Sequence, residues 1–194
     1  MLQLGQGRGY VEIGAGHGQW ARALAEEHGQ RYNASSSSSL DNNNNNAEEF
    51  VLAFDNQSAL PLNTGVYHAY TKPAHSYFYP NVRQNTTTND ALVQGTGRIL
   101  LMVYPGPGNM AHEALVSYTA LNQDLQDDVI VVYVGEGRSG ANANDAFFDL
   151  LQSGDWILVK ELEVLPPLGG KGYEKMFVFK LSRTTETDSS SSLS

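Results

Sequence analysis

The sequence predicts an α/β domain with a mostly parallel sheet, helices on both faces and an antiparallel edge strand near the C-terminus. Short apolar runs alternate along the chain with segments whose apolar residues recur at helical spacing. The central runs are continuously apolar, as is typical of parallel strands covered on both faces. The last two runs have no helix between them, so we expect them to pair antiparallel.

Each element follows from a run and from the residue that ends it. Strands are predicted at Tyr10–Ile13, Phe50–Phe54, Arg98–Tyr104, Val129–Val134, Trp156–Leu162 and Lys175–Leu181. Helices are predicted at Gln19–His28, Met110–Leu121 and Asn144–Gln152, the first ended by Gly29 and the last followed by Gly154. Residues 56–96 receive no confident strand, because their aromatic stretch is interrupted by Pro73.

Two polar segments set the domain limits. Residues 34–46 and 182–194 are rich in serine, asparagine or threonine, and neither can bury enough apolar surface to offset the entropy lost on ordering. We therefore expect one domain over residues 1–181, with a low-complexity insertion at 34–46 and a disordered tail at 182–194. An insertion of this length adds little to the entropy cost of closing the loop.

Composition excludes several classes of function. The 194 residues include no cysteine, which removes disulfides, thiol nucleophiles and thiolate metal sites. The five histidines form no ligand pair, so no metal site is expected. A net charge of -9 without a basic run disfavours nucleic-acid binding. No apolar run is long enough to span a membrane, and the N-terminus has no secretory pattern, so an intracellular, cytoplasmic protein is expected.

The most informative segment is Glu12–Gly18, which reads EIGAGHG between the first predicted strand and the first predicted helix. Glycines at such a turn permit positive φ and let a ligand approach the backbone. The dinucleotide fingerprint G-x-G-x-x-G does not fit, because Gln19 stands where its third glycine belongs. A glycine-rich turn without a ligand remains an alternative at this point.

The pattern acidic-x-G-x-G-x-G resembles the first motif of the class I S-adenosylmethionine (SAM)-dependent methyltransferases, which have a Rossmann-like fold. The resemblance implies that Gly14, Gly16 and Gly18 contact SAM and that Glu12 holds its amino end, directly or through water. It also implies that Asp55, at the end of the second predicted strand, binds the ribose hydroxyls. The alternative for Asp55 is an ordinary turn residue before Asn56.

Two later loops are expected at the same edge of the sheet, on the side of the methyl acceptor. Tyr104–Gly108 (YPGPG) departs from the Asp/Asn-Pro-Pro-aromatic motif of amino-group methyltransferases, which argues against an amino acceptor. Gly135–Gly140 (GEGRSG) presents Glu136 on a glycine-rich turn. Tyr104 and Glu136 are the candidate catalytic residues, as an acceptor-orienting phenol and a general base. A packed tyrosine and a solvated carboxylate are the alternatives.

The second half of the chain also resembles a eukaryotic branch of this superfamily. The matching residues are Tyr104-Pro105, Val134–Gly137 and Asp145–Phe148. The sequence thus favours an enzyme that transfers a methyl group from SAM to an acceptor it does not identify, a small molecule or a protein. A catalytically inactive SAM- or nucleotide-binding scaffold is the alternative, and a nicotinamide enzyme is disfavoured by the glycine spacing.

Overall fold

The computed structural model describes residues 7–35, 50–56, 78–84, 87–164 and 173–182. Its strands are β1 (Tyr10–Ile13), β2 (Val51–Asp55), β3 (Arg83–Gln84), β4 (Ile99–Val103), β5 (Ile130–Gly135), β6 (Trp156–Glu163) and β7 (Lys175–Leu181). Its described helices are α1 (Gln19–Ser35), α3 (Thr88–Gln94), α4 (Met110–Asn122) and α5 (Asp145–Gln152). The predicted α/β class is confirmed.

The strands form one sheet in the order β3-β2-β1-β4-β5-β7-β6. The pairs among β3, β2, β1, β4 and β5 are all parallel, whereas β7 is antiparallel to both of its neighbours. The predicted antiparallel edge near the C-terminus is therefore confirmed: the last two strands pair antiparallel, with β6 as the edge strand and β7 one position inside it. Because β7 lies between β5 and β6, the strand order differs from the 3-2-1-4-5-6 order of the dinucleotide-binding sheet.

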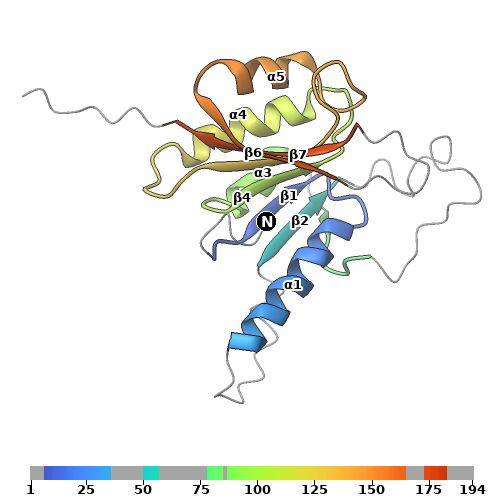
Figure 1. The fold of residues 1–194 in the computed structure, drawn as a ribbon. Helices are drawn as coiled ribbons and strands as arrows, with labels where there is room; N and C mark the ends of the chain where they lie inside the picture. Colours follow the sequence, from blue (N-terminus) through green and yellow to red (C-terminus); the bar gives the residue numbers. More distant parts are fainter. Residues whose placement is uncertain (1–6, 36–49, 57–77, 85–86, 165–172, 183–194) are drawn as a thin grey trace, which may run out of the picture.

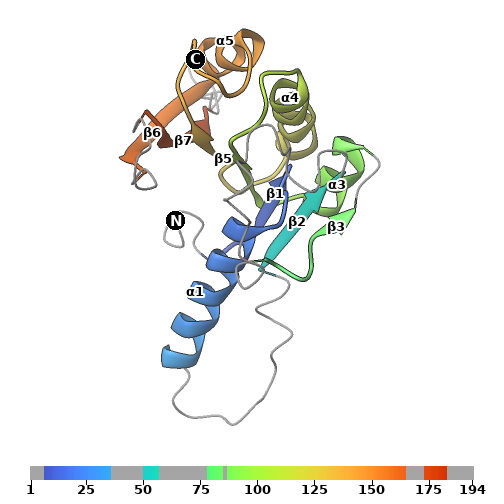
Figure 2. The same cartoon turned by 90° about the vertical axis from the view of Figure 1, so that its right-hand side faces the viewer.

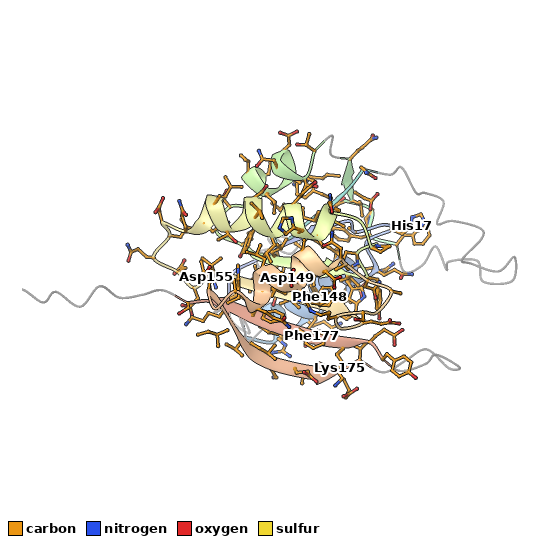
Figure 3. All side chains as sticks on the ribbon, turned by 90° about the horizontal axis from the view of Figure 1, so that it is seen from above. His17, Phe148, Asp149, Asp155, Lys175 and Phe177 are labelled. Atoms are coloured by element: carbon orange, nitrogen blue, oxygen red, sulfur yellow. The ribbon has the colours of Figure 1, made fainter. Side chains whose placement is uncertain are left out.

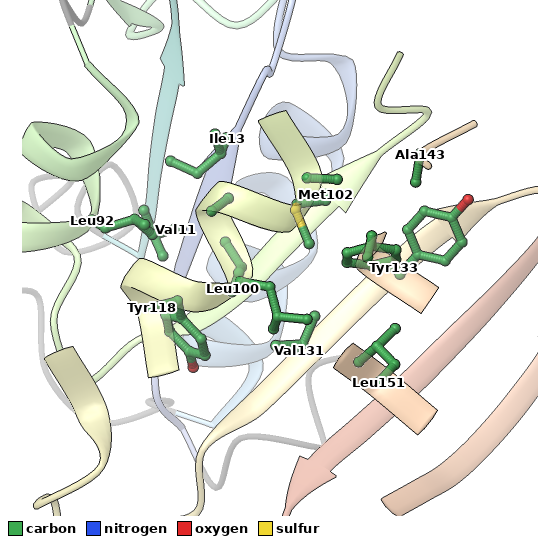
Figure 4. Close-up of a cluster of buried hydrophobic side chains, with 14 of the residues drawn as sticks. Val11, Ile13, Leu92, Leu100, Met102, Tyr118, Val131, Tyr133, Ala143 and Leu151 are labelled. Atoms are coloured by element: carbon green, nitrogen blue, oxygen red, sulfur yellow. The ribbon is translucent and has the colours of Figure 1, made fainter. Parts of the chain in front are cut away.

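Helices cover both faces of the sheet (Figures 1 and 2), with α1 on one side and α3, α4 and α5 on the other. Successive strand residues alternate between two cores, so Leu100 and Met102 pack toward α4 while Ile99 and Leu101 pack on the side of α1. Figure 4 shows the core on the α4 and α5 side. Among the described helices, none has the length and apolar character to cross a bilayer.

The first helix is longer than predicted. It continues through Gly29 to Ser35, so Gly29 does not end it and Ala34 and Ser35 belong to it rather than to an insertion. A helical glycine costs only about 1 kcal/mol relative to alanine, and it ends a helix only when it adopts the left-handed conformation. An ion pair of 2.7 Å joins Glu27 and Arg31, one turn apart in this part of the helix. Residues 36–46 of the predicted insertion lie outside the described residues.

Two elements within residues 56–96 were missed by the sequence analysis. The two-residue strand β3 pairs with the end of β2, and α3 follows shortly after it. Thr87 caps α3, since its side chain accepts a hydrogen bond of 3.1 Å from the backbone of Asp90, and Gly95 follows the last turn. The Thr87-x-x-Asp90 spacing is the signal that could have located this helix.

Candidate functional site

The glycine loop lies at the point where the strand order reverses. From β1 the chain builds toward β2 and β3, and then crosses to β4 and β5 on the other side. Open α/β sheets bind ligands at this switch point, outside the carboxyl ends of the strands. Residues 14–18 follow β1 and residues 104–109 follow β4, so the two loops chosen from the sequence lie on either side of the switch point.

All three glycines of the loop have positive φ, at +72° for Gly14, +56° for Gly16 and +72° for Gly18. A β-carbon on Gly16 would meet no atom within 4 Å, and one on Gly14 would meet only the end of the flexible Met110 side chain at 3.2 Å. The backbone at these two positions is accessible to a ligand.

Gly18 has a different environment. A β-carbon there would lie 2.6 Å from both Tyr79 Cβ and Val82 Cγ2, because residues 78–82 pack directly on the loop. The same segment stacks Phe78 on His17, with ring centroids 3.9 Å apart, and the amide of Tyr79 donates to the carbonyl of His17 at 2.9 Å. Figure 3 labels His17, at the right-hand side of that view. This packing explains why residue 18 is a glycine, whereas a contact between Gly18 and SAM stays a prediction.

Glu12 is the most unusual residue of the site. It lies on β1 with 2% of its surface exposed, and no hydrogen bond reaches its Oε2 atom. Burial raises the pKa of Glu12 to about 8, against a hydrogen bond from the Ala21 backbone that lowers the pKa and the Asp55 charge that raises it further. A buried carboxylate with an unsatisfied oxygen is costly unless a cation or a donor completes it.

Asp55 directly contacts the glycine loop. Its Oδ2 atom accepts a hydrogen bond of 2.8 Å from the Gly16 amide, which ties the end of β2 to the middle of the loop. The carbonyl of Phe54 accepts a second bond of 3.0 Å from the Ala15 amide. The structure therefore brings Glu12, Asp55 and the glycines together at one edge of the sheet, as the sequence predicted, and gives Asp55 a loop-positioning role that the sequence did not show.

Tyr104 occupies a strained position at the end of β4. Its φ is +48°, a left-handed conformation that few residues other than glycine adopt, and its side chain is 43% exposed. Desolvation and the nearby Glu174 carboxylate both raise the pKa of the Tyr104 phenol. Its backbone amide is held by the Val134 carbonyl at 2.8 Å. Such strain persists where the surrounding structure enforces it, often in a functional loop.

The side chain of Glu136 interacts within its own loop, and that of Arg138 interacts with α5. The Glu136 carboxylate accepts a bond of 2.8 Å from the Ala141 amide and so closes its own loop. Arg138 lies against α5, with ion pairs of 2.7 Å to Asp149 and 3.3 Å to Asp145. Glu136 thus has a structural role in addition to the catalytic role predicted from the sequence.

Glu174 was missed by the sequence analysis. It precedes β7, and the alternation of strand residues puts it on the same face as Met176 and Val178, the face of α1. Its Oε2 atom is buried and has no hydrogen-bond partner. No motif marks this residue in the sequence, since it becomes notable only when β7 is placed beside β5.

Comparison with known proteins gives distant structural likenesses. No family model matches the chain, and no curated protein matches it. Among solved structures, LepI in complex with SAM is similar at 10% identity and a TM-score of 0.43, over 90% of this chain and 43% of LepI. A LepI variant in complex with SAH and a substrate analogue is similar at 12% identity and a TM-score of 0.42, over 90% of this chain and 43% of that protein. The mitomycin 7-O-methyltransferase MmcR is similar at 10% identity and a TM-score of 0.41, over 92% of this chain and 50% of MmcR. This chain spans half or less of the length of those proteins.

The environments of Gly16 and Gly18 generate a matched test. We expect Gly18→Ala to destabilise the fold substantially more than Gly16→Ala, because both substitutions carry the left-handed backbone penalty of about 1–2 kcal/mol but only the first also collides with Tyr79 and Val82. Urea unfolding of the two variants measures the difference. Equal losses would contradict the packing of residues 78–82 on the loop.

Proposed function

We propose that this chain binds SAM at the carboxyl edge of β1 and β4 and transfers its methyl group to an acceptor. The observation that carries the proposal is the Glu12 carboxylate, which is buried beside the glycine loop with one oxygen lacking a hydrogen bond. The α-ammonium group of SAM is a cation that can satisfy this oxygen. The first-motif resemblance of Glu12–Gly18 assigns the same role to Glu12.

The other residues fit the remaining parts of the molecule. The open backbone at Gly14 and Gly16 would contact the methionine portion and the ribose, and the Asp55 carboxylate would accept hydrogen bonds from the ribose hydroxyls. When bound, SAM would supply an electrophilic methyl group on a positively charged sulfur. The chain would contribute mainly by holding the donor and the acceptor in line, a task that needs few specialised side chains.

On the acceptor side, the candidate residues are Tyr104, Glu136 and Glu174. Tyr104 can orient an acceptor through its phenol or offer its ring face to the sulfonium. Glu174 is the stronger candidate for accepting a proton, because its Oε2 atom is without a partner whereas the Glu136 carboxylate already binds Ala141. The acceptor is proposed to be a small molecule or a protein, in an intracellular setting.

The first test is a calorimetric titration of the full chain with SAM. Asp55→Ala should weaken binding by about 1.5–3 kcal/mol, the range for hydrogen bonds to a charged group. Asp55→Asn is the control for the loop contact. The asparagine amide oxygen can still accept the hydrogen bond from the Gly16 amide, whereas the carboxylate charge is lost. An unchanged affinity in the alanine variant would make Asp55 a turn residue only, and no binding by the wild-type chain would refute the proposed function.

Glu12 generates a pH dependence. With its pKa raised to about 8, Glu12 is mostly protonated at pH 7 in the free protein and must release that proton to bind an ammonium group. Affinity for SAM should therefore rise as the pH increases toward 8. Titrations at pH 7 in buffers of different ionisation enthalpy should detect proton release in the wild type, and markedly less in Glu12→Gln. The same release in both proteins would remove Glu12 from the binding site.

Turnover separates the acceptor-side residues. With SAM and a panel containing a phenol, a primary alcohol and an amine, formation of the demethylated product measures transfer. Tyr104→Phe and Glu174→Gln should keep SAM affinity, and loss of a general base should lower turnover by about 100-fold or more in Glu174→Gln. Glu136→Gln retains an oxygen for Ala141, so a similar loss there would instead assign the base to Glu136. SAM binding without any turnover would favour the scaffold alternative.

A further inference from the structure

The loop that follows β4 is tied to the loop that follows β5. The Asn142 side chain uses both of its polar atoms: Oδ1 accepts a hydrogen bond of 3.1 Å from the Glu136 amide, and Nδ2 donates one of 3.4 Å to the Pro105 carbonyl. The same carbonyl accepts a bond of 3.0 Å from the Ala143 amide. We call these three contacts the Asn142 bridge. It joins residues 37 positions apart, so no local pattern in the sequence reveals it.

The residue directly before Pro105 has a strained backbone. Tyr104 has a φ of +48°, whereas a residue before proline favours an extended backbone with negative φ. Such a conformation persists only where the surrounding structure enforces it. The Val134 carbonyl accepts a bond of 2.8 Å from the Tyr104 amide, and the Asn142 bridge holds the next carbonyl along the chain. Contacts on both sides therefore fix the backbone of Tyr104 and the direction in which its side chain leaves.

The segment that forms the bridge is itself anchored in the core. Ala143 is also left-handed, with a φ of +56°, and is 5% exposed. The Tyr133 hydroxyl donates a bond of 2.6 Å to the Glu136 carbonyl, and Figure 4 labels Tyr133 and Ala143 in the same core. A β-carbon at Gly135 would lie 2.7 Å from that hydroxyl and 3.1 Å from Asn142 Oδ1. The close approach of these groups therefore favours a glycine at position 135.

The loop that the bridge holds also reaches the glycine loop. Residues 104–109 run from the end of β4 to the start of α4. The first residue of α4 is Met110, and its terminal methyl carbon lies 3.2 Å from where a β-carbon of Gly14 would be. At that end of the loop, Asn109 accepts a bond of 2.8 Å from Asn144, which caps α5. The contact between Asn109 and Asn144 secures the far end of the loop, whereas the Asn142 bridge lies next to Tyr104.

We propose that Asn142 is a positioning residue for the acceptor side, which acts by holding Tyr104 in place at the end of β4. This role rests on the proposed methyl transfer, in which Tyr104 orients the acceptor. Asparagine suits the role because one amide group supplies an acceptor for the Glu136 amide and a donor for the Pro105 carbonyl. A displacement of about 1 Å at a reacting group can lower turnover about 100-fold. Asn142 can therefore affect transfer without touching the acceptor.

The direct test reports on Tyr104 itself and needs neither SAM nor an acceptor. The full chain is produced with 3-fluorotyrosine, and the fluorine resonance of residue 104 is the one that Tyr104→Phe lacks. Asn142→Ala should shift this resonance, because it removes two of the three contacts of the bridge. It should also lower the pKa of the Tyr104 phenol toward that of free 3-fluorotyrosine, since a released side chain moves into water and away from Glu174.

Asn122→Ala is the matched control. Asn122 makes the same pair of contacts at the opposite end of the sheet, where it accepts a bond of 2.8 Å from the Gly97 amide and donates one of 2.7 Å to the Tyr118 carbonyl. This variant should leave the resonance of residue 104 and the pKa of its phenol unchanged. If circular dichroism shows that Asn142→Ala does not fold, Asn142→Asp replaces it. Aspartate keeps an acceptor for Glu136 but offers no donor to Pro105, so the resonance should again shift.

Turnover supplies a second readout once transfer to an acceptor is detected. Asn142→Ala should lower turnover about tenfold or more, with SAM affinity within about twofold of the wild type. In a Tyr104→Phe background, the same substitution should cause little further loss, because Asn142 acts through the phenol.

An unchanged resonance in the Asn142 variants, or an equal change in Asn122→Ala, would overturn the role of Asn142. A wild-type chain that does not bind SAM would instead refute the proposed function, and the fluorine resonance would still show whether Asn142 holds Tyr104.

Discussion

The parallel pairing of β1 with both β2 and β4 is the constraint on which the rest of this structure depends. β1 has only four residues, all of them buried, and each takes its position from the register Ile13 with Phe54 and Glu12 with Leu101. That register sets where the chain must turn, and therefore where the glycine loop begins. It also brings Asp55 to the height of the loop, where it holds the Gly16 amide.

The same register forces Glu12 into the interior on the side of α1. Replacing this carboxylate by an apolar residue of similar size would remove an unsatisfied buried atom, so the glutamate is not explained by stability. Proteins tolerate such costs mainly where a ligand completes the interaction. The raised pKa is the physical sign of that incomplete environment, because burial leaves the charged form without the partners that water would supply.

The parts of the structure that were predictable are those set by local sequence. The apolar runs predicted six strands, and the position of Glu12–Gly18 between a strand and a helix predicted the loop. The two missed elements are short, and β3 has only two residues, so neither shows a periodicity. The predicted end of the first helix at Gly29 was wrong, because a glycine ends a helix only when its backbone adopts the left-handed conformation. The partners of Glu136 and the burial of the Glu174 Oε2 atom depend on how distant segments meet, which no local pattern encodes.

The two-residue period of the strands finally accounts for how the side chains of β5 and β7 divide between the two faces of the sheet. Along β7, Met176 and Val178 point to the face of α1, as does Glu174 before them, whereas Phe177 and Phe179 point to the face of α5. β5 sorts Val132 and Tyr133 in the same way. A slip of one residue between β5 and β7 would exchange the two sets and bury Lys180 in place of Phe179. The antiparallel register therefore fixes which side chains of β7 face α1 and which face α5.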